Sequence, residues 1–337
     1  MKSPSVSIVI IGRNEEEYIE KTINAALREA DCVDGQIVVV DSGSSDGTSE
    51  IAQRYPVKVV QIEDSPALTA AATRQVGLAN CDGDIVFFVD GDCVLAPGWV
   101  QAAVKTLMDH PDIAGVMGRL NEVYLCDGVV VGEKVNACEM TNEAPIETHW
   151  VGGNAAYWRS ALELADGGFN PNIRSLEELE LFLRLKKLGK KILLLPETMV
   201  THYTEDRWTF WATIGRFKRG LYMGYGQVLR SSISNGFFLE FVRLEIRTFI
   251  FGFVILAGIG LCVLDVFLGH VIFTVLYTAL VLLSFLVMAV KNSSIKWPVL
   301  IYLTWSLNIV GLLQGLIKML PRTSSLPIRY NIIKDND

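Results

Sequence analysis

The stretch IVFFVDGDC, residues 85–93, places five apolar residues directly before two aspartates that flank a glycine. An apolar run of this length is typical of a buried strand. Asp-Gly is also a common turn dipeptide, so Asp90 and Asp92 either close the strand or hold a charged ligand. Hard divalent cations such as Mg²⁺ and Mn²⁺ prefer carboxylate oxygens, often together with substrate phosphates. The DxD spacing alone is weak evidence for a cation site. The position of this motif directly after a strand strengthens that evidence.

Similar apolar runs occur earlier in the chain, and charged segments with helical character separate them. The expected strands are residues 6–11, 37–40, 57–62 and 85–89, and the expected helices are 14–30, 48–54, 69–78 and 98–108. Strands that are apolar throughout and alternate with helices indicate a parallel sheet covered on both faces. The sequence therefore predicts a doubly wound, Rossmann-like α/β domain.

Polar clusters follow three of the predicted strands. They are residues 12–15 (GRNE), the loop 41–48 (DSGSSDGT) and residues 90–92 (DGD). In sheets of this type, ligands bind beyond the carboxyl ends of the strands, so one site can gather all three clusters. Asp41 offers a carboxylate to a nucleobase N–H, whereas Asp46 suits a cap on the next helix better than a ligand contact. The dinucleotide fingerprint GxGxxG is absent.

A later helix is predicted over residues 176–188, with an apolar face and an i,i+4 pair between Glu180 and Arg184. Glu177 and Glu178 open this helix. They are either catalytic carboxylates or acidic residues that the helix dipole favours in a first turn.

Apolar segments dominate the last third of the chain. Residues 249–290 contain one charged residue, Asp265, and residues 297–317 contain none. The first stretch fits two membrane spans of about 20 residues each, with Asp265, Gly269 and His270 near the loop between them. The second stretch is long enough for a third span. Buried helices of a soluble protein are the alternative, which three adjacent segments of this length argue against.

Residues 207–239 contain five basic residues, no acidic one, and interleaved aromatic residues. Such a segment before a membrane span suits the lipid headgroup layer. A solvated helix is the alternative, while nucleic acid is disfavoured by the net charge of −7 and by the absence of a binding motif.

Six cysteines without CxxC pairing fit a reducing compartment. Residues 1–7 contain no apolar signal-peptide region, so we expect the first domain in the cytosol.

The basic residues near the apolar segments set the expected orientation. Those before the first span, together with Lys291 and Lys296, agree with a cytosolic domain. Lys318, Arg322, Arg329 and Lys334 follow the third segment, and three full crossings would place them outside, against the positive-inside tendency. Either this end of the chain is an exception or the last segment does not cross fully.

Five motifs occur in order: SIVIIGRNEE, IVVVDSGSSDGT, TRQVGLANCDGDIVFFVDGD, VGGNAAYWRSAL, and GGFN followed by EELELFLRLKKLGKKI. Over roughly residues 6–203 this set resembles the family 2 glycosyltransferases, which have the GT-A nucleotide-sugar-binding fold. The resemblance implies transfer of a sugar from a nucleotide diphosphate donor, UDP- or GDP-linked, with inversion at the anomeric carbon.

The resemblance also assigns roles on the donor side. Asp41 matches the nucleobase-contacting aspartate, Arg74 a basic residue near the diphosphate, and Asp90 and Asp92 the motif that holds Mn²⁺ or Mg²⁺. We expect Asp92 to contact the metal directly and Asp90 to face the ribose or a bound water. The remaining expected donor-binding residues are Gly12, Asn14, Glu15 and Gly91.

On the acceptor side, Glu178 stands where the family usually has a catalytic aspartate, so it is the expected base, and Glu177 is the alternative. A base is needed because the acceptor hydroxyl must lose its proton as it attacks. His202 resembles a histidine that helps hold the metal in some relatives. Gly153 and Asn154 are expected on the acceptor side, and His149 and Trp150 are weaker candidates there.

The expected organisation is a catalytic domain over residues 1–205, a basic-aromatic interfacial segment over 206–245, a transmembrane region of about three helices over 246–320, and a polar tail over 321–337. The expected protein is a multi-pass membrane enzyme of cell-envelope glycan or glycolipid synthesis. Its partners are a nucleotide sugar, a lipid-linked or membrane-proximal acceptor and membrane lipids, with no nucleic acid.

Three alternatives remain at this stage. A processive polysaccharide synthase usually carries QxxRW, but here Gln227 and Arg230 are followed by Ser231. A sugar-phosphate nucleotidylyltransferase needs a basic Gly-rich loop, for which GRNEE is too acidic. A non-catalytic membrane scaffold does not require the intact set of Asp90, Asp92 and Glu178.

Overall fold

The computed structural model describes residues 3–33, 35–63, 68–126, 129–136, 144–148, 151–205, 209–318 and 328–335. The chain forms two compact units. The first comprises Met1–Asp206 and Leu320–Asp337, and the second comprises Arg207–Met319. His149, Trp150, Arg207 and Trp208 lie outside the described residues.

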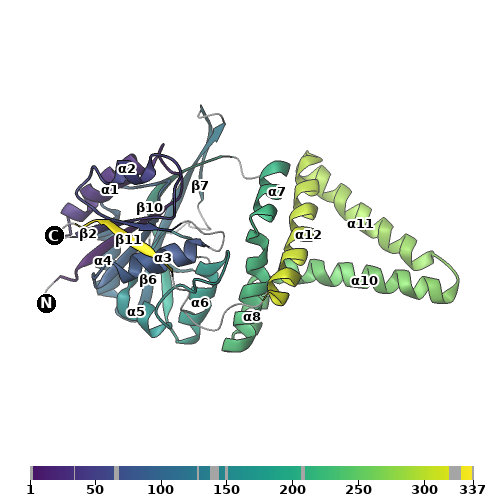
Figure 1. Ribbon diagram of the computed structural model, residues 1–337. Helices are drawn as coiled ribbons and strands as arrows, with labels where there is room; N and C mark the ends of the chain where they lie inside the picture. Colours follow the sequence, from purple (N-terminus) through teal and green to yellow (C-terminus); the bar gives the residue numbers. More distant parts are fainter. Residues whose placement is uncertain are drawn as a thin grey trace. The chain divides into compact units, whose positions relative to one another are not determined.

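The first unit is built on a mixed sheet with the strand order β11-β3-β2-β1-β4-β9-β6-β10-β5 (Figure 1). Four neighbouring strands are parallel, and their apolar side chains are largely buried: β1 (Val6–Gly12), β2 (Gly35–Asp41), β3 (Lys58–Ile62) and β4 (Ile85–Asp90). The predicted α/β sheet and its four strands are therefore confirmed.

The other side of the sheet contains antiparallel pairs that the sequence pattern did not indicate. Its strands are β5 (Cys93–Leu95), β6 (Ile113–Cys126), β7 (Val129–Asn136), β8 (Ile146–Glu147), β9 (Ala155–Trp158) and β10 (Lys191–Glu205). Strand β9 runs antiparallel to both β4 and β6. Strand β10 brings His202 opposite Cys93 of β5, which places the late histidine beside the DGD motif.

Helices of the first unit follow most of the predicted positions: α1 (Ile19–Asp31), α2 (Thr48–Ala52), α3 (Ala70–Ala79), α4 (Trp99–Asp109), α5 (Arg159–Leu164) and α6 (Glu177–Lys187). The expected start of the first helix at residue 14 was wrong. Asn14 has a φ of 59°, and the amides of residues 14–16 donate hydrogen bonds to the side chains of Ser44, Thr48 and Asp46. Because a neighbouring loop binds these amides, the helix begins only at Ile19.

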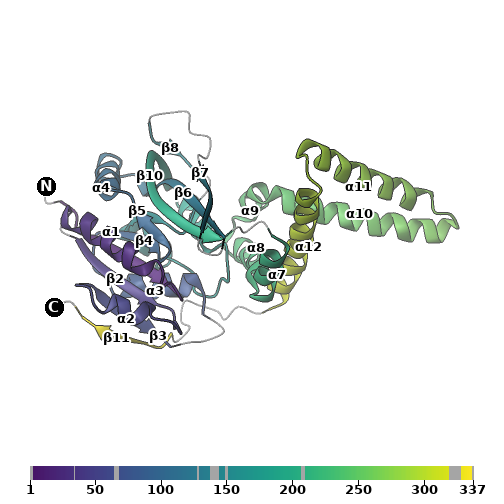
Figure 2. The same ribbon diagram turned by 90° about the horizontal axis from the view of Figure 1, so that it is seen from above.

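The final strand, β11 (Tyr330–Lys334), returns to the first unit. It pairs antiparallel with β3 at the edge of the sheet (Figure 2). Lys58 and Asp335 form an ion pair at 3.5 Å beside this contact. Residues 321–337, expected to be a polar tail, therefore include a strand of the sheet of the first unit.

The second unit is helical in its described part. Its shorter helices are α7 (Phe210–Lys218), the 3₁₀ helix η1 (Leu221–Met223), α8 (Gly224–Asn235) and α9 (Phe238–Leu244). Three long apolar helices follow: α10 (Ile246–Leu268), α11 (Ile272–Lys291) and α12 (Lys296–Ile317). By length and composition, each of these three could cross a membrane, as the sequence predicted.

The α10–α11 pair is a tight helical hairpin (Figures 1 and 2). Asp265 lies in the last turn of α10, and its carboxylate accepts hydrogen bonds from the amides of Phe273 and Thr274 at 3.2 and 2.7 Å. It also pairs with His270 at 2.7 Å. The one acidic residue of this apolar stretch therefore caps the first turn of α11.

Candidate active site

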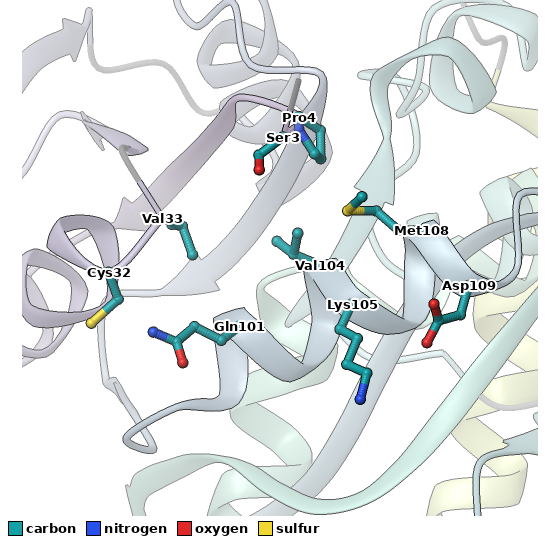
Figure 3. Close-up of a pocket in the computed structure, with 9 residues that line it drawn as sticks. All are labelled: Ser3, Pro4, Cys32, Val33, Gln101, Val104, Lys105, Met108 and Asp109. Carbon is teal, nitrogen blue, oxygen red and sulfur yellow. The ribbon is translucent and has the colours of Figure 1, made fainter. Parts of the chain in front are cut away.

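The carboxyl ends of β1, β2 and β4 meet at one edge of the parallel sheet. In the strand register, Gly12 lies beside Asp41, and Ile11 lies beside Asp90. The three polar clusters predicted from the sequence therefore gather at one place. The 290 Å³ pocket in Figure 3 lies at the opposite edge, near Ser3 and Pro4 before β1 and Lys105 of α4, and is remote from this chemistry.

Two loops at this edge are held together by polar contacts. The Asn14 amide donates to Ser44 Oγ at 2.9 Å, and the Asn14 side-chain oxygen accepts from the Ser45 amide at 2.8 Å. Asp46 accepts hydrogen bonds from the Thr48 amide at 3.1 Å and the Glu16 amide at 3.2 Å. As predicted, Asp46 supports the start of α2, and it also links that start to the loop after β1.

Asp41 is fully buried at the end of β2. Its carboxylate accepts hydrogen bonds from the Ser44 amide at 3.2 Å and from the Gln61 side chain at 3.2 Å. The carboxylate is thus fixed in direction, as a group that recognises a base must be, although its base-binding role stays a prediction.

Gly91 allows a close approach between the first and fourth strands. A Cβ atom at Gly91 would lie 3.0 Å from Glu15 Cγ and 3.3 Å from Gly12 Cα. The Gly91 carbonyl accepts a hydrogen bond from Thr22 at 2.8 Å. The glycine between the two aspartates is therefore required by packing, and it brings Glu15 next to the DGD motif.

Asp92 and His202 form the candidate metal centre. His202 Nε2 lies 3.1 Å from Asp92 Oδ2, and the two residues group with Cys93 so that one ligand atom of each lies within 4.8 Å of the others. On the other side of the imidazole, Glu122 Oε1 lies 4.0 Å from Nδ1, where a carboxylate orients a metal-binding histidine. Burial raises the pKa of the Cys93 thiol, which leaves the carboxylate and the imidazole as the better ligands.

Acidic charge converges on the same point. Burial, followed by the charges of Asp92, Asp90 and Asp46, raises the pKa of Glu15 to about 8. A divalent cation would relieve this repulsion, and oxygen with imidazole is a donor set that suits Mn²⁺ or Mg²⁺. The residues present therefore fit the expected cation.

Arg74 connects the DGD motif to the start of α6. Its side chain is 3% exposed, and its guanidinium lies 2.8 Å from Asp90 Oδ1, 2.8 Å from Glu177 Oε1 and 3.3 Å from Glu178 Oε1. Burial lowers the pKa of Arg74, but Asp90 and the two glutamates outweigh that effect and raise it. Arg74 was expected at the donor diphosphate, and in the structure it is shared among three carboxylates.

Glu177 and Glu178 both contact the positive charge of Arg74. Burial and the neighbouring Glu178 raise the pKa of Glu177 to about 8, while Arg74 opposes the rise. Burial also raises the pKa of Glu178, against the same arginine. Glu178 is the more accessible of the two, with a side chain 19% exposed against 6% for Glu177. This favours Glu178 as the group that receives a proton and Glu177 as its support.

Leu176, the residue before Glu177, adopts a φ of 63°. This left-handed conformation costs a leucine about 1–2 kcal/mol, and such strain is found where surrounding structure fixes a functional turn. The strained residue sets the entry into α6 and with it the direction of both glutamates. In the same helix, the predicted Glu180–Arg184 pair is confirmed at 2.8 Å, and both side chains are buried.

Gly153 and Asn154 touch Asp90. The Asn154 side-chain oxygen accepts a hydrogen bond from the Asp90 amide at 2.8 Å, and its amide group lies 3.5 Å from Asp90 Oδ2. A Cβ atom at Gly153 would lie 2.8 Å from Asp90 Oδ2. Both residues therefore position the metal motif in the structure, while their acceptor-side role stays a prediction.

Neither Glu122 nor the central place of Arg74 was evident from the sequence. Glu122 lies in β6, a strand whose pattern gave no signal, and the pairing of β6 with β10 places it beside His202. Arg74 was recognised only through the motif, because no spacing along the chain reveals a contact between residues 74 and 177.

Comparison with known proteins identifies the class. Residues 7–163 match the family model described as Glycosyl transferase family 2. Mannosyltransferase PcManGT from Pyrobaculum calidifontis, solved in complex with GDP-Man and Mn²⁺, is similar with a TM-score of 0.61 at 16% identity, covering 94% of this chain and 88% of that chain. The first unit thus has the fold of GT-A glycosyltransferases. The chain therefore contains a domain, over residues 7–163, that matches Glycosyl transferase family 2.

Curated relatives match parts of the chain. Glycosyltransferase AglE of Haloferax volcanii is 36% identical over 109 residues, which cover 31% of this chain and 36% of that protein. The succinoglycan biosynthesis protein ExoA of Rhizobium meliloti is 24% identical over 238 residues, which cover 67% of this chain and 69% of that protein. The chain spans between 33% and 42% of the length of the first curated relatives that it matches.

Proposed function

We propose that this protein is a membrane-associated inverting glycosyltransferase that moves a sugar from a UDP- or GDP-linked donor to a lipid-linked or membrane-proximal acceptor in cell-envelope glycan or glycolipid synthesis. The observation that carries the proposal is that Arg74 joins Asp90 of the DGD motif to the buried carboxylate pair of Glu177 and Glu178, while Asp92 of the same motif pairs with His202 as the candidate cation site. The Mn²⁺ complex of the structural neighbour supports the choice of cation.

On the donor side, Asp92 and His202 would hold the cation, with Glu122 orienting the imidazole. The bound cation supplies Lewis-acid stabilisation of the charge that grows on the leaving diphosphate. Asp90 is held by Arg74 and Asn154 and does not belong to the group of Asp92, Cys93 and His202 among the described residues, which suits the expected contact with the ribose or a bound water.

On the acceptor side, Glu178 would remove the proton of the attacking hydroxyl. Its raised pKa brings the carboxylate closer to neutral pH, where a general base is most effective. Arg74, 3.3 Å away, stabilises the ionised form before the reaction. Inversion follows when the hydroxyl attacks from the face of the sugar opposite the diphosphate.

The membrane part of the proposal rests on the three apolar helices and on the basic-aromatic segment before them. An acceptor embedded in or near lipid would meet an enzyme held at the same surface. We propose that the catalytic unit faces the cytoplasm, in agreement with the basic residues that flank the apolar helices.

The test is a screen of nucleotide sugars with the full-length protein in lipid nanodiscs, with and without Mn²⁺, measuring release of nucleoside diphosphate and labelled product. Glu178→Gln should lower the rate by about 10²–10⁴-fold. Glu163→Gln, a change on the exposed surface of α5, is the control and should leave the rate unchanged. Transfer that survives both Glu178→Gln and Asp92→Ala would exclude the mechanism.

The products separate the alternatives. A nucleotidylyltransferase releases pyrophosphate, and a processive synthase extends a labelled acceptor by many sugars. We expect nucleoside diphosphate and single additions.

A further inference from the structure

We propose that the apolar helices cross the membrane twice, as the α10–α11 hairpin, and that α12 lies along the membrane surface on the side of the catalytic unit, with membrane lipid against its exposed apolar face. This arrangement concerns the path of the chain. It does not depend on sugar transfer.

Strand β11 determines on which side of the membrane the chain lies after the three apolar helices. This strand follows all three apolar helices and is paired with β3 through Tyr330–Ile62, Asn331–Gln61 and Ile332–Val60. Hydrogen-bonded strands must lie on the same side of a membrane. The chain therefore leaves and re-enters the catalytic side, and the number of crossings is even.

Helices α10 and α11 are better suited to cross the membrane than α12. Helices α10 and α11 have mean hydropathies of 2.5 and 2.4, against 1.6 for α12. Their lengths of roughly 34 and 30 Å, at 1.5 Å per residue, match a hydrocarbon core of about 30 Å. A tip of three residues, Gly269, His270 and Val271, joins them. These two helices are therefore the crossing pair.

The third step is where α12 touches the hairpin. Tyr302 and Trp305, in the first half of α12, pack against Phe251 with ring centroids 5.8 and 5.2 Å apart. Asn308, in the middle of α12, lies 3.5 Å from Thr248. Thr248 and Phe251 lie in the first two turns of α10. Tyr302 also packs on Phe285 of α11.

Thr248 lies two residues, roughly 3 Å, from the start of α10, which is the end that faces the catalytic side, whereas Asn308 lies twelve residues, roughly 18 Å, from the start of α12. In a third span, Asn308 would lie past mid-bilayer. Its contact with Thr248 places the middle of α12 near the headgroup boundary instead.

The fourth step is the partner of α12. A Cβ atom at Gly315 would lie 2.9 Å from the Gln227 amide, and one at Gly311 would overlap the backbone of Tyr222. This close packing keeps α12 at the depth of η1 and α8. Helix α8 has only 12 residues and carries Gln227 and Arg230, so it is too short and too polar to span the hydrocarbon core.

The pictures agree with this placement within the second unit. In both views α12 runs across the direction of the α10–α11 hairpin and beside α7 and α8 (Figures 1 and 2). If α10 and α11 cross the bilayer, α12 runs closer to parallel with the bilayer plane than they do. The outward residues of α12 are mainly apolar, with Val310 41%, Leu313 54% and Ile317 80% exposed, which suits the acyl boundary.

The charges also agree. Arg243, Arg247, Lys291, Lys296 and Lys318 then all lie at the catalytic side, and the far-side tip carries His270. Two crossings therefore satisfy the positive-inside tendency that three crossings violate.

The first test places one epitope at the N-terminus, between Gly269 and His270, or after Asp337 of the full-length protein. Protease is then applied to sealed inside-out and right-side-out vesicles. We expect the two terminal epitopes to be cleaved from the same side and the tip epitope from the other. A C-terminal epitope opposite the N-terminal one, or a tip on the same side as both, would overturn the proposal. An epitope after Thr323 repeats the test without touching β11, and the unfolding temperature of each variant confirms folding.

The second test measures depth. A genetically encoded fluorescent amino acid replaces Val310 of α12 or Leu280 of α11, which is 65% exposed. The protein is then placed in lipids brominated near the headgroup or near the chain end. We expect Val310 to be quenched more by the shallow bromines and Leu280 more by the deep ones. Equal deep quenching at both positions would mean that α12 crosses.

Discussion

Replacing Arg74 with methionine removes a cation that Asp90, Glu177 and Glu178 share, while keeping most of the side-chain volume. The arginine contacts these carboxylates at 2.8, 2.8 and 3.3 Å and is 3% exposed. Breaking a buried ion pair by removing one partner costs about 3–5 kcal/mol. At roughly 2–4 °C per kcal/mol for a unit of this size, the unfolding temperature should fall by about 6–20 °C near pH 8.

The stability lost in Arg74→Met should depend on pH, and the direction of that dependence follows from the pKa of Glu177. The pKa of Glu177 is raised from 4.5 to about 8, so the folded protein holds this proton more tightly than the unfolded chain. The stability from this group is fully present below pH 4.5 and is lost as pH rises through 8. Without Arg74, which lowers the pKa of both glutamates, the loss on raising pH becomes steeper. The gap between wild type and Arg74→Met should widen from pH 5 to pH 8.

The assay is thermal unfolding of the full-length protein in detergent at several pH values. Arg159→Met is the matched control, because Arg159 donates to the backbone carbonyls of Gly83 and Cys81 at 2.8 Å and should lose stability with little pH dependence between 5 and 8. An Arg74→Met loss that is equal at pH 5 and pH 8 would refute the charge-sharing account and leave only a packing defect.

Two further predictions concern the metal centre and the sheet. Asp92→Asn and His202→Ala should each lower the affinity for Mn²⁺, measured by calorimetry, at least about tenfold, while Glu163→Gln should leave it unchanged. Unchanged affinity in both Asp92→Asn and His202→Ala would show that these residues do not bind the cation. Gly83→Ala should destabilise the protein by about 2 kcal/mol or more, since its Cβ would lie 2.6 Å from a backbone nitrogen of β1. Gly132→Ala, where the added Cβ would meet no atom of the described residues within 4 Å, is the neutral control, and equal unfolding temperatures for the two variants would contradict the packing argument.

The parallel half of the fold could be predicted because its strands are buried on both faces and therefore read as unbroken apolar runs. Strand β6 could not, because its burial changes along its 14 residues from buried to half-exposed, and no single period describes it. The start of α1 was missed for a different reason. The amides of residues 14–16 bond to a loop that is about 30 residues distant in sequence, and a local pattern contains no such information.

In the candidate site too, some residues could be predicted from the sequence and others could not. Asp90, Asp92 and Glu178 stand at fixed places in motifs, so sequence alone could single them out. The contact of Asn154 with Asp90 and that of Glu122 with His202 arise from strand pairing. Such contacts depend on sheet order, which the sequence did not reveal beyond the parallel strands.

The position of β11 has a consequence for biosynthesis. The ribosome makes this strand after the whole helical hairpin, so the edge of β3 stays uncovered by β11 while the apolar helices enter the membrane. An unpaired strand edge is a site of aggregation. The sheet can therefore be completed only after the three apolar helices have been synthesised, and a fragment ending near residue 205 would lack the strand that covers the β3 edge.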